Sequence, residues 1–195
     1  VIRTTDGGNS WYGSQIAGAY HLEHIHFPSQ NVGYSSGPDG IYKSTNGGVT
    51  WSNITPNEFA DYWGCYFIDE NIGLVIGGGC NGTQRFYRTS NGGQSWTLFQ
   101  GNEPNSGLTD LILYNPNGLG YAVSSGRLWQ TTDGGFTWSV FASSGSNIWQ
   151  EEITNAGNSF LLPYAGINCS GQGQDGGMRF TTDKGLTWNN YKTGE

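Results

Sequence analysis

The sequence predicts an all-β protein made of repeated four-stranded antiparallel sheets, and three observations carry that prediction. The 195 residues include 33 Gly, eight Trp, eleven Tyr and nine Phe, and only 12% of them are charged. A chain so rich in aromatic residues and so poor in charge buries a core instead of staying disordered. Its Gly, Asn, Ser and Thr are typical of short strands joined by tight turns. The third observation is an internal repeat.

The repeat is an eight-residue phrase that occurs five times. It is TTDGGNSW at 4–11, STNGGVTW at 44–51, TSNGGQSW at 89–96, TTDGGFTW at 131–138 and TTDKGLTW at 181–188. The tryptophans that close the phrases are spaced by 40, 45, 42 and 50 residues. A period of about 40–50 residues with strand-like content indicates a β-propeller, in which each blade is one four-stranded sheet.

Each repeat predicts four strands in order. In the first complete repeat they cover 22–27, 32–37, 40–45 and 49–54, and the phrase forms the turn between the third and fourth. The turn between the first two strands aligns without gaps at 27–34, 67–74, 114–121 and 153–160. The chain is therefore predicted to be one propeller region over 1–195. We expect a half blade at 1–15 and complete blades at 19–54, 59–100, 106–142 and 146–192.

The phrase has the chemistry of a turn. Its Asp or Asn can accept bonds from backbone N–H groups two or three residues later, and the Gly two positions on can take a positive φ. The position between them is Lys184 in the last repeat, so we expect it to be less constrained. Two of the five Asp/Asn positions hold Asn, and a protein normally has one active site instead of five copies. We therefore interpret the phrase as structural. The structural residues are Asp6, Asn46, Asn91, Asp133 and Asp183, with Trp11, Trp51, Trp96, Trp138 and Trp188.

The pattern S/T-x-D/N-x-G-x-S/T-W resembles the Asp-box, or BNR repeat, of sialidases, xyloglucan-cleaving glycosidases and sortilin-type receptors. The stretches FPSQNVGY (27–34) and GIYKSTNGGVTW (40–51) are most similar to photosystem II assembly-factor-like propellers, a group that includes many exported bacterial proteins. The resemblance covers nearly the whole chain. It implies a propeller whose ligand sites lie around the central channel, on the face opposite the box turns.

The number of repeats predicts an incomplete ring. A propeller closes by completing one blade from both ends of the chain, and an open ring leaves unpaired sheet edges. We expect the chain to be part of a larger propeller of six or seven blades. The alternative is a five-bladed ring with a depleted first blade.

The charge balance excludes some partners. The net charge is −7 and the isoelectric point about 4.7, so there is no basic stripe for nucleic acid. No apolar run approaches the roughly 20 residues of a membrane span. The low Lys content and the polar surface favour an extracellular, cell-surface or periplasmic location.

The three cysteines have no metal-ligand spacing. The sequence does not decide between a Cys65–Cys80 disulfide and a Cys80–Cys169 disulfide. His24 and His26 share a strand face, but no third ligand is apparent, so we expect neither a metal nor another cofactor.

The first strand of each blade should line the channel and hold the candidate site. His24-Ile25-His26, Gly64-Cys65-Tyr66, Leu111-Ile112-Leu113 and Gln150-Glu151-Glu152 fall in equivalent slots, preceded by Glu23, Trp63, Asp110 and Trp149. Aromatic rings beside carboxylates suit sugar stacking or a peptide contact. A solvated channel mouth and packing between blades are the alternatives. The candidate ligand-binding residues are Trp63, Tyr66, Asp110, Trp149, Glu151, Glu152, His24 and His26.

Two functions follow from these observations. The first is a non-catalytic exported scaffold that presents loops to a protein or glycan. The alternative is a glycoside hydrolase of the Asp-box type, xyloglucanase-like or sialidase-like, with catalytic groups partly outside this chain. Arg3, Lys43 and Arg88 occupy one repeated slot, so we expect them to point outward at the rim instead of converging as in a sialidase. Asp110 with Glu151 or Glu152 is the candidate carboxylate pair.

Overall fold

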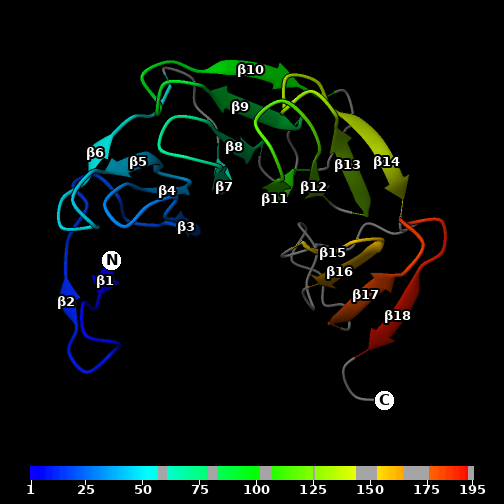
Figure 1. Cartoon of the computed structure of the whole chain (residues 1–195), viewed down its shortest axis with the longest axis horizontal. Helices are drawn as coiled ribbons and strands as arrows, with labels where there is room; N and C mark the ends of the chain where they lie inside the picture. The colour runs from blue at the N-terminus through cyan, green and yellow to red at the C-terminus, as the bar shows by residue number, and fades with distance from the viewer. Residues whose placement is uncertain are drawn as a thin grey trace.

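The computed structural model describes residues 1–56, 61–78, 83–101, 107–124, 126–143, 153–164 and 176–192. Every regular element in these ranges is a β-strand. Figure 1 shows the sheets standing side by side along an arc around a common centre, with the two chain termini at opposite ends of the arc. The arc stays open between its first and last sheets (Figure 1).

The strands form one two-stranded sheet and four sheets of four strands. Their bounds, sheet by sheet, are β1 (Ile2–Arg3) and β2 (Tyr12–Gly13); β3 (His24–His26), β4 (Gly33–Gly37), β5 (Gly40–Ser44) and β6 (Ser52–Asn53); β7 (Tyr62–Phe67), β8 (Gly73–Gly77), β9 (Arg85–Thr89) and β10 (Thr97–Gln100); β11 (Leu108–Leu113), β12 (Gly120–Ser124), β13 (Arg127–Thr131) and β14 (Ser139–Ser143); β15 (Thr154–Ala156), β16 (Ser159–Tyr164), β17 (Gly177–Thr181) and β18 (Asn189–Lys192).

Each four-stranded sheet is an antiparallel meander in which consecutive strands are neighbours. Its first strand lies nearest the centre of the arc and its last strand at the outer rim (Figure 1). This confirms the predicted all-β fold of four-stranded antiparallel sheets.

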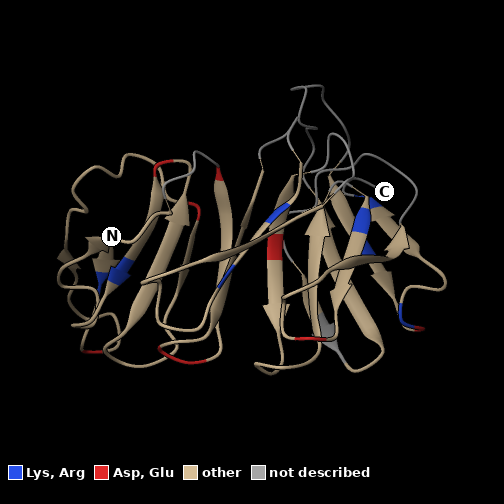
Figure 2. Ribbon diagram, turned by 90° about the horizontal axis from the view of Figure 1, so that it is seen from above, with Lys and Arg blue, Asp and Glu red and all other residues tan. Residues whose placement is uncertain are grey.

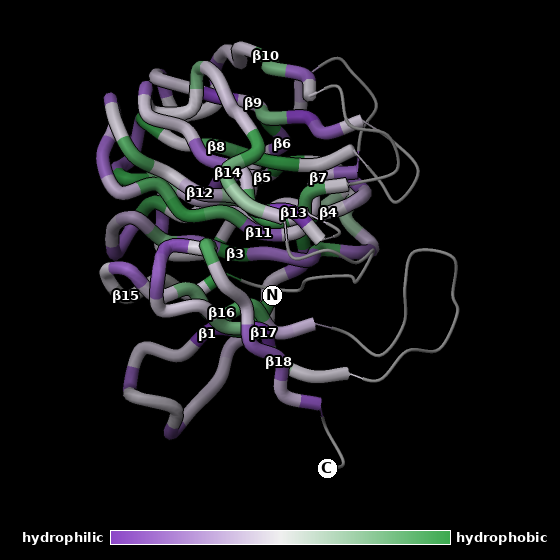
Figure 3. The backbone as a smooth tube through the Cα atoms, turned by 90° about the vertical axis from the view of Figure 1, so that its right-hand side faces the viewer, coloured by the Kyte–Doolittle hydropathy of each residue, from purple (hydrophilic) through white to green (hydrophobic). Residues whose placement is uncertain are grey.

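The hydrophobic core is divided among the junctions between sheets. One cluster joins the sheets β3–β6 and β7–β10, a second joins β7–β10 and β11–β14, and a third joins β11–β14 and β15–β18. Figure 3 shows the hydrophobic segments concentrated along the strands of the middle sheets. Since each sheet buries its faces only against its neighbours, the arc is a one-dimensional stack like other repeat proteins.

The five box turns share one hydrogen-bond pattern. The hydroxyl of the first Ser or Thr accepts the N–H of the second Gly at 2.9 Å in every turn. The Asp or Asn Oδ1 accepts the N–H of the residue four positions later at 2.9–3.0 Å. The expected reach of two or three residues was therefore too short, although Asp133 also accepts the N–H of Phe136, three residues on. Two left-handed residues inside each turn fold the chain back onto the acceptor.

Asp and Asn exchange in these turns because the Ser or Thr before Trp is a hydroxyl that can donate or accept. Where the residue is Asp6, the Ser10 hydroxyl donates to the carboxylate at 2.5 Å. Where it is Asn46, the amide donates to the Thr50 hydroxyl at 2.8 Å. The turn closes in both cases, as a structural role requires.

The position before the second Gly is more constrained than the sequence indicated. Gly7, Gly47, Gly92 and Gly134 have φ between 66° and 76°, and Lys184 in the last turn has φ 59°. Lys184 is the one non-Gly residue with positive φ among the described residues. The last turn accepts a side chain with the same backbone as the others, and the expectation of a looser position is wrong.

Basic side chains tie two of the sheets to the box turn of the next. Lys43 Nζ donates to Gly92 O at 3.1 Å, and Arg88 Nε donates to Gly134 O at 2.9 Å. Arg88 also donates to Pro116 O at 3.2 Å and is only 7% exposed. These residues do not converge on one point, as expected, but they bridge sheets where an outward, rim-exposed orientation was predicted. Figure 2 shows the acidic and basic residues scattered over the ribbon.

The pairing register corrects one predicted alignment. Leu113 pairs with Gly120, whereas Phe67 pairs with Gly73, so the turn after β11 is one residue longer than the turn after β7. Asp110 therefore pairs at the level of Gly64 and His24 and does not share the slot of Glu23 and Trp63. Because side chains alternate along a strand, this single residue changes the side on which the carboxylate lies.

Candidate functional site

The inner strands bring His24, Cys65 and Asp110 together at the centre of the arc. His24 Nδ1 on β3 is 3.6 Å from Cys65 Sγ on β7. His24 Nε2 is 3.7 Å from Asp110 Oδ1 on β11. Gly64 occupies the corresponding slot on the sheet between His24 and Asp110, and it has no side chain to separate them.

Asp110 connects three sheets. Its Oδ2 accepts the backbone N–H of Ile153, just before β15, at 2.9 Å, while its Oδ1 faces His24 on β3. The side chain is only 10% exposed. A carboxylate this buried needs such partners, because an uncompensated charge is expensive to remove from water.

The cluster lies toward the face opposite the box turns. His24 pairs with Ser36, next to the turn that joins β4 to β5, and Asp110 pairs with Val123, next to the turn that joins β12 to β13. This is the face on which the resemblance placed ligand sites.

Cys65 is a free, buried cysteine, so the disulfide between Cys65 and Cys80 is wrong. Burial raises the pKa of its thiol to about 12; the nearby Asp110 charge also raises it and a hydrogen bond with Ser36 opposes the rise. The thiol is therefore protonated at neutral pH and is a poor nucleophile. Cys80 and Cys169 lie outside the described residues.

His26 and Tyr66 form a second contact between the same two inner strands. Their rings stack with centroids 4.7 Å apart, and His26 Nδ1 accepts the backbone N–H of Phe67 at 3.3 Å. Burial, and then the neighbouring His24, lower the pKa of His26. His26 is consequently neutral at pH 7, with its proton on Nε2.

The remaining predicted residues do not join this cluster. Trp63 is half-buried at the bulge in β7 between Tyr62 and Gly64, so it offers less surface for stacking than an exposed Trp would. Trp149, Glu151 and Glu152 lie outside the described residues. The candidate carboxylate pair therefore stays a prediction.

In chemical terms, the described cluster is one imidazole between a neutral thiol and a carboxylate that is already hydrogen-bonded. In the part of the chain that the structure describes, no three His, Cys, Asp or Glu residues are placed to hold a metal ion. Sequence comparison missed Cys65 and Ile153 as partners. No sequence signal places Asp110 beside His24, because the turns at 27–34, 67–74 and 114–121 align without gaps.

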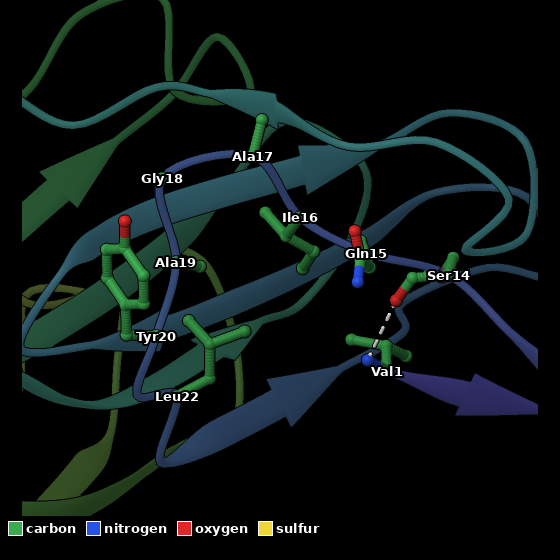
Figure 4. Close-up of a pocket in the computed structure, with 9 residues that line it drawn as sticks. All are labelled: Val1, Ser14, Gln15, Ile16, Ala17, Gly18, Ala19, Tyr20 and Leu22. Atoms are coloured by element: carbon green, nitrogen blue, oxygen red, sulfur yellow. Dashed lines mark hydrogen bonds between the residues drawn. The ribbon is translucent and has the colours of Figure 1, made fainter.

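A large open hollow of about 640 Å³ lies elsewhere, between Val1 and the segment 14–22 (Figure 4). Its nine lining residues carry one charged group, the Val1 α-ammonium, which donates to Ser14 O at 3.0 Å. Figure 4 shows mostly small and aliphatic side chains around the rest of the hollow, with the Tyr20 ring and the Gln15 amide among them. Nothing in this lining connects it with the cluster of His24, Cys65 and Asp110, which we call the inner-strand cluster.

Comparison with known proteins rests on three-dimensional structure. No family model matches the chain, and no curated protein matches its sequence. An ancestral GH74 enzyme superposes with a TM-score of 0.79 and 17% identity, covering 97% of this chain and 28% of that one. YCF48 bound to D1 peptide superposes with a TM-score of 0.74 and 15% identity, covering 100% of this chain and 60% of that one.

The fold is that of a β-propeller. YCF48 from Cyanidioschyzon merolae gives a TM-score of 0.65 at 15% identity and covers 89% of this chain and 56% of that one. The chain thus spans 28% and 60% of the lengths of the first two propellers. At such low sequence identity, the structural similarity establishes the fold of the chain and does not identify its ligand.

No helix in the described ranges has the length and hydropathy needed to cross a bilayer.

Proposed function

We propose that the chain is a non-catalytic binding propeller of the Asp-box type. It holds a partner protein or glycan on the face opposite the box turns, around the channel. The observation that carries the proposal is the carboxylate of Asp110, whose bond to Ile153 N and contact with His24 fasten three sheets together. Such a cluster makes a rigid frame beneath the loops, and rigid frames with irregular loops are where binding concentrates.

One structural neighbour supports a protein partner. YCF48 is a propeller of similar fold that has been solved with a bound peptide. A protein partner is therefore the first candidate for this chain and a glycan the second. We further propose an extracellular, cell-surface or periplasmic location, on the low Lys content and polar composition.

The test compares two variants that each introduce a lysine, on opposite faces. Glu23 is exposed beside the cluster, and Gln30 is exposed in the first turn of the same sheet. The purified chain would be used to capture partners from the exported fraction of its source organism, with a glycan array run in parallel. Glu23→Lys should weaken capture at least roughly tenfold, and Gln30→Lys should leave it within about twofold. Equal binding by both variants, or no captured ligand, would overturn the proposal.

The second candidate is glycoside hydrolysis, favoured by the superposition on a GH74 enzyme and by the buried carboxylate of Asp110. The purified chain would be assayed on xyloglucan and on sialyllactose. Our proposal expects no release of sugar. Hydrolysis that falls at least about 100-fold in Asp110→Asn would replace the binding function by the enzymatic one.

We also propose that the chain belongs to a ring of six or seven blades. The open arc supports this, as does the small share of the GH74 enzyme that the chain covers. The intact mass of the protein purified from its source decides the point. A mass well above 21.1 kDa is expected, and a mass at that value would contradict the larger ring.

A further inference from the structure

Two hollows lie side by side in the outer junction between the sheets β3–β6 and β7–β10. One, of about 250 Å³, lies between Lys43, Thr45 and Ser52 on one side and the box turn at 92–94 on the other. The second, of about 390 Å³, lies between 53–56 and 93–96. Ile54, Gly93 and Gln94 line both, so the two hollows form one groove along β6.

The next junction shows why the groove is open. There, the Arg88 guanidinium lies over the Phe136 ring, 4.0 Å from its centroid, and the ring is 48% exposed. In the groove junction the same two positions hold Lys43 and Gln94, and Gln94 is exposed. The groove junction therefore lacks the aromatic ring that packs on the basic side chain in the next junction.

The short outer strand lengthens the groove. β6 has two residues, whereas β10 has four and β14 has five. The chain leaves the sheet at Thr55, whose hydroxyl accepts the N–H of Ile41 at 2.8 Å while its own N–H is held by Asn53 Oδ1 at 2.8 Å. These bonds fix the departure of the chain, so the groove is a defined feature of the fold.

The lining selects an uncharged ligand rich in hydroxyl groups. Its floor is apolar, formed by Ile54 and the accessible part of Trp96. Its walls carry hydroxyl and amide groups, including those of Thr45, Ser52 and Gln94. The lining residues include no carboxylate and a single cation, Lys43, whose ammonium already donates to Gly92 O at 3.1 Å.

A pyranose ring combines an apolar C–H face with a rim of hydroxyls, and aromatic floors with amide and hydroxyl walls complement it. We propose that this groove binds a short segment of a neutral oligosaccharide. The site is separate from the inner-strand cluster and does not depend on what occupies the opposite face.

The repeat provides the test variant. Gln94→Phe places in the groove the residue found at the same position of the next box turn, where Phe136 packs against Arg88. Asn9→Phe adds the same ring at the equivalent, exposed position of the first turn and serves as the control. Binding of cellohexaose, maltohexaose and mannohexaose would be followed by ligand-observed NMR and by titration.

At least one hexasaccharide should bind the wild type with a Kd of at most about 10 mM. Gln94→Phe should weaken that binding at least roughly tenfold, and Asn9→Phe should change it by less than about twofold. The melting temperature of each variant confirms that it is folded. Absence of binding by all three sugars, or equal binding by wild type and folded Gln94→Phe, would overturn the inference.

Discussion

Lys184 shows how strictly the box turn fixes its backbone. It adopts φ 59° where four other turns place Gly, although left-handed backbone costs a residue with a Cβ about 1–2 kcal/mol. Its N–H donates to Asn158 O at 2.8 Å, a bond equivalent to those that Gly47, Gly92 and Gly134 make in their turns. The hydrogen bonds of the turn thus override the preference of the residue.

Replacing Lys184 with Gly should stabilise the protein by roughly 0.5–1 kcal/mol, because relief of the strained φ exceeds the added flexibility of the unfolded chain. Chemical denaturation measures the change. Gly7→Lys is the reciprocal control, since an added Cβ at Gly7 meets no atom within 4 Å, and it should destabilise by a similar amount. A neutral effect of both variants would show that φ is not the controlling quantity.

The carboxylates of the box turns respond to acid. Hydrogen bonds from the hydroxyl and N–H of Ser10 lower the pKa of Asp6 from 3.8 to about 2. Hydrogen bonds with the Thr181 and Thr187 hydroxyls lower the pKa of Asp183 by the same extent. A pKa that is lower in the folded state adds stability above pH 3.8, and that stability is lost as the pH falls toward 2.

The double variant Asp6→Asn/Asp183→Asn should therefore lose less of its melting temperature than the wild type between pH 4 and pH 2, the window of these pKa shifts. Asn46 and Asn91 show that the amide fits the same turn. Thermal melts across this pH range test the prediction. Parallel curves for the two proteins would contradict it.

At the scale of the elements, two junctions between sheets combine an apolar cluster with a basic bridge. Arg88 donates from β9 to the turn after β13, and Lys43 donates from β5 to the turn after β9. Tyr34 adds a third bond of the same direction, to Glu70 O at 2.7 Å. In these three bridges to box turns and inner turns the donor lies in the earlier sheet.

Arg88→Met should destabilise the protein by about 2–4 kcal/mol, because it leaves buried carbonyls without their charged donor. Arg88→Lys should cost less, since Lys43 makes one such bond in the preceding junction. Denaturation in urea measures both. A loss of less than about 0.5 kcal/mol for Arg88→Met would show that the apolar cluster alone holds the sheets together.

The sequence predicted the strands and turns better than it predicted the side-chain contacts between sheets. The repeated phrase placed the sheets and the turns because its Trp spacing and its second Gly follow directly from blade geometry. Asp110 was assigned to the wrong slot because the turn after β11 has one extra residue, which no strand pattern reveals. The buried contact of Cys65 with His24 joins two sheets, and the pattern of a single repeat contains no information on such contacts.

At the scale of the whole molecule, the two ends of the arc expose what the internal junctions bury. Trp11 is 57% exposed in the first box turn, whereas Trp138 is 6% exposed in the fourth. At the other end of the arc Tyr191 is 68% exposed. Tyr191 lies three residues after Trp188, and Ile54 lies at the equivalent position, three residues after Trp51. Ile54 packs on Gly93 of the following box turn. We infer that the two ends can meet as the two sides of one junction.

The 195-residue chain should consequently self-associate head to tail at high concentration, as heterologous contacts do. Tyr191→Ser should shift the association constant toward the monomer, while Tyr20→Ser, at an exposed position outside the junction, should not. Sedimentation velocity over a range of concentrations distinguishes them. A monomer at every concentration would refute the complementarity of the ends.

The one-way direction of the bridges bears on how such a chain grows. The sheet β7–β10 carries both the donor Arg88 for the turn that follows and the turn that accepts from Lys43. A tandem duplication of that sheet would therefore bring both halves of this contact into register at once. Blade number can change in single genetic steps, while the chemistry of a face must be assembled residue by residue.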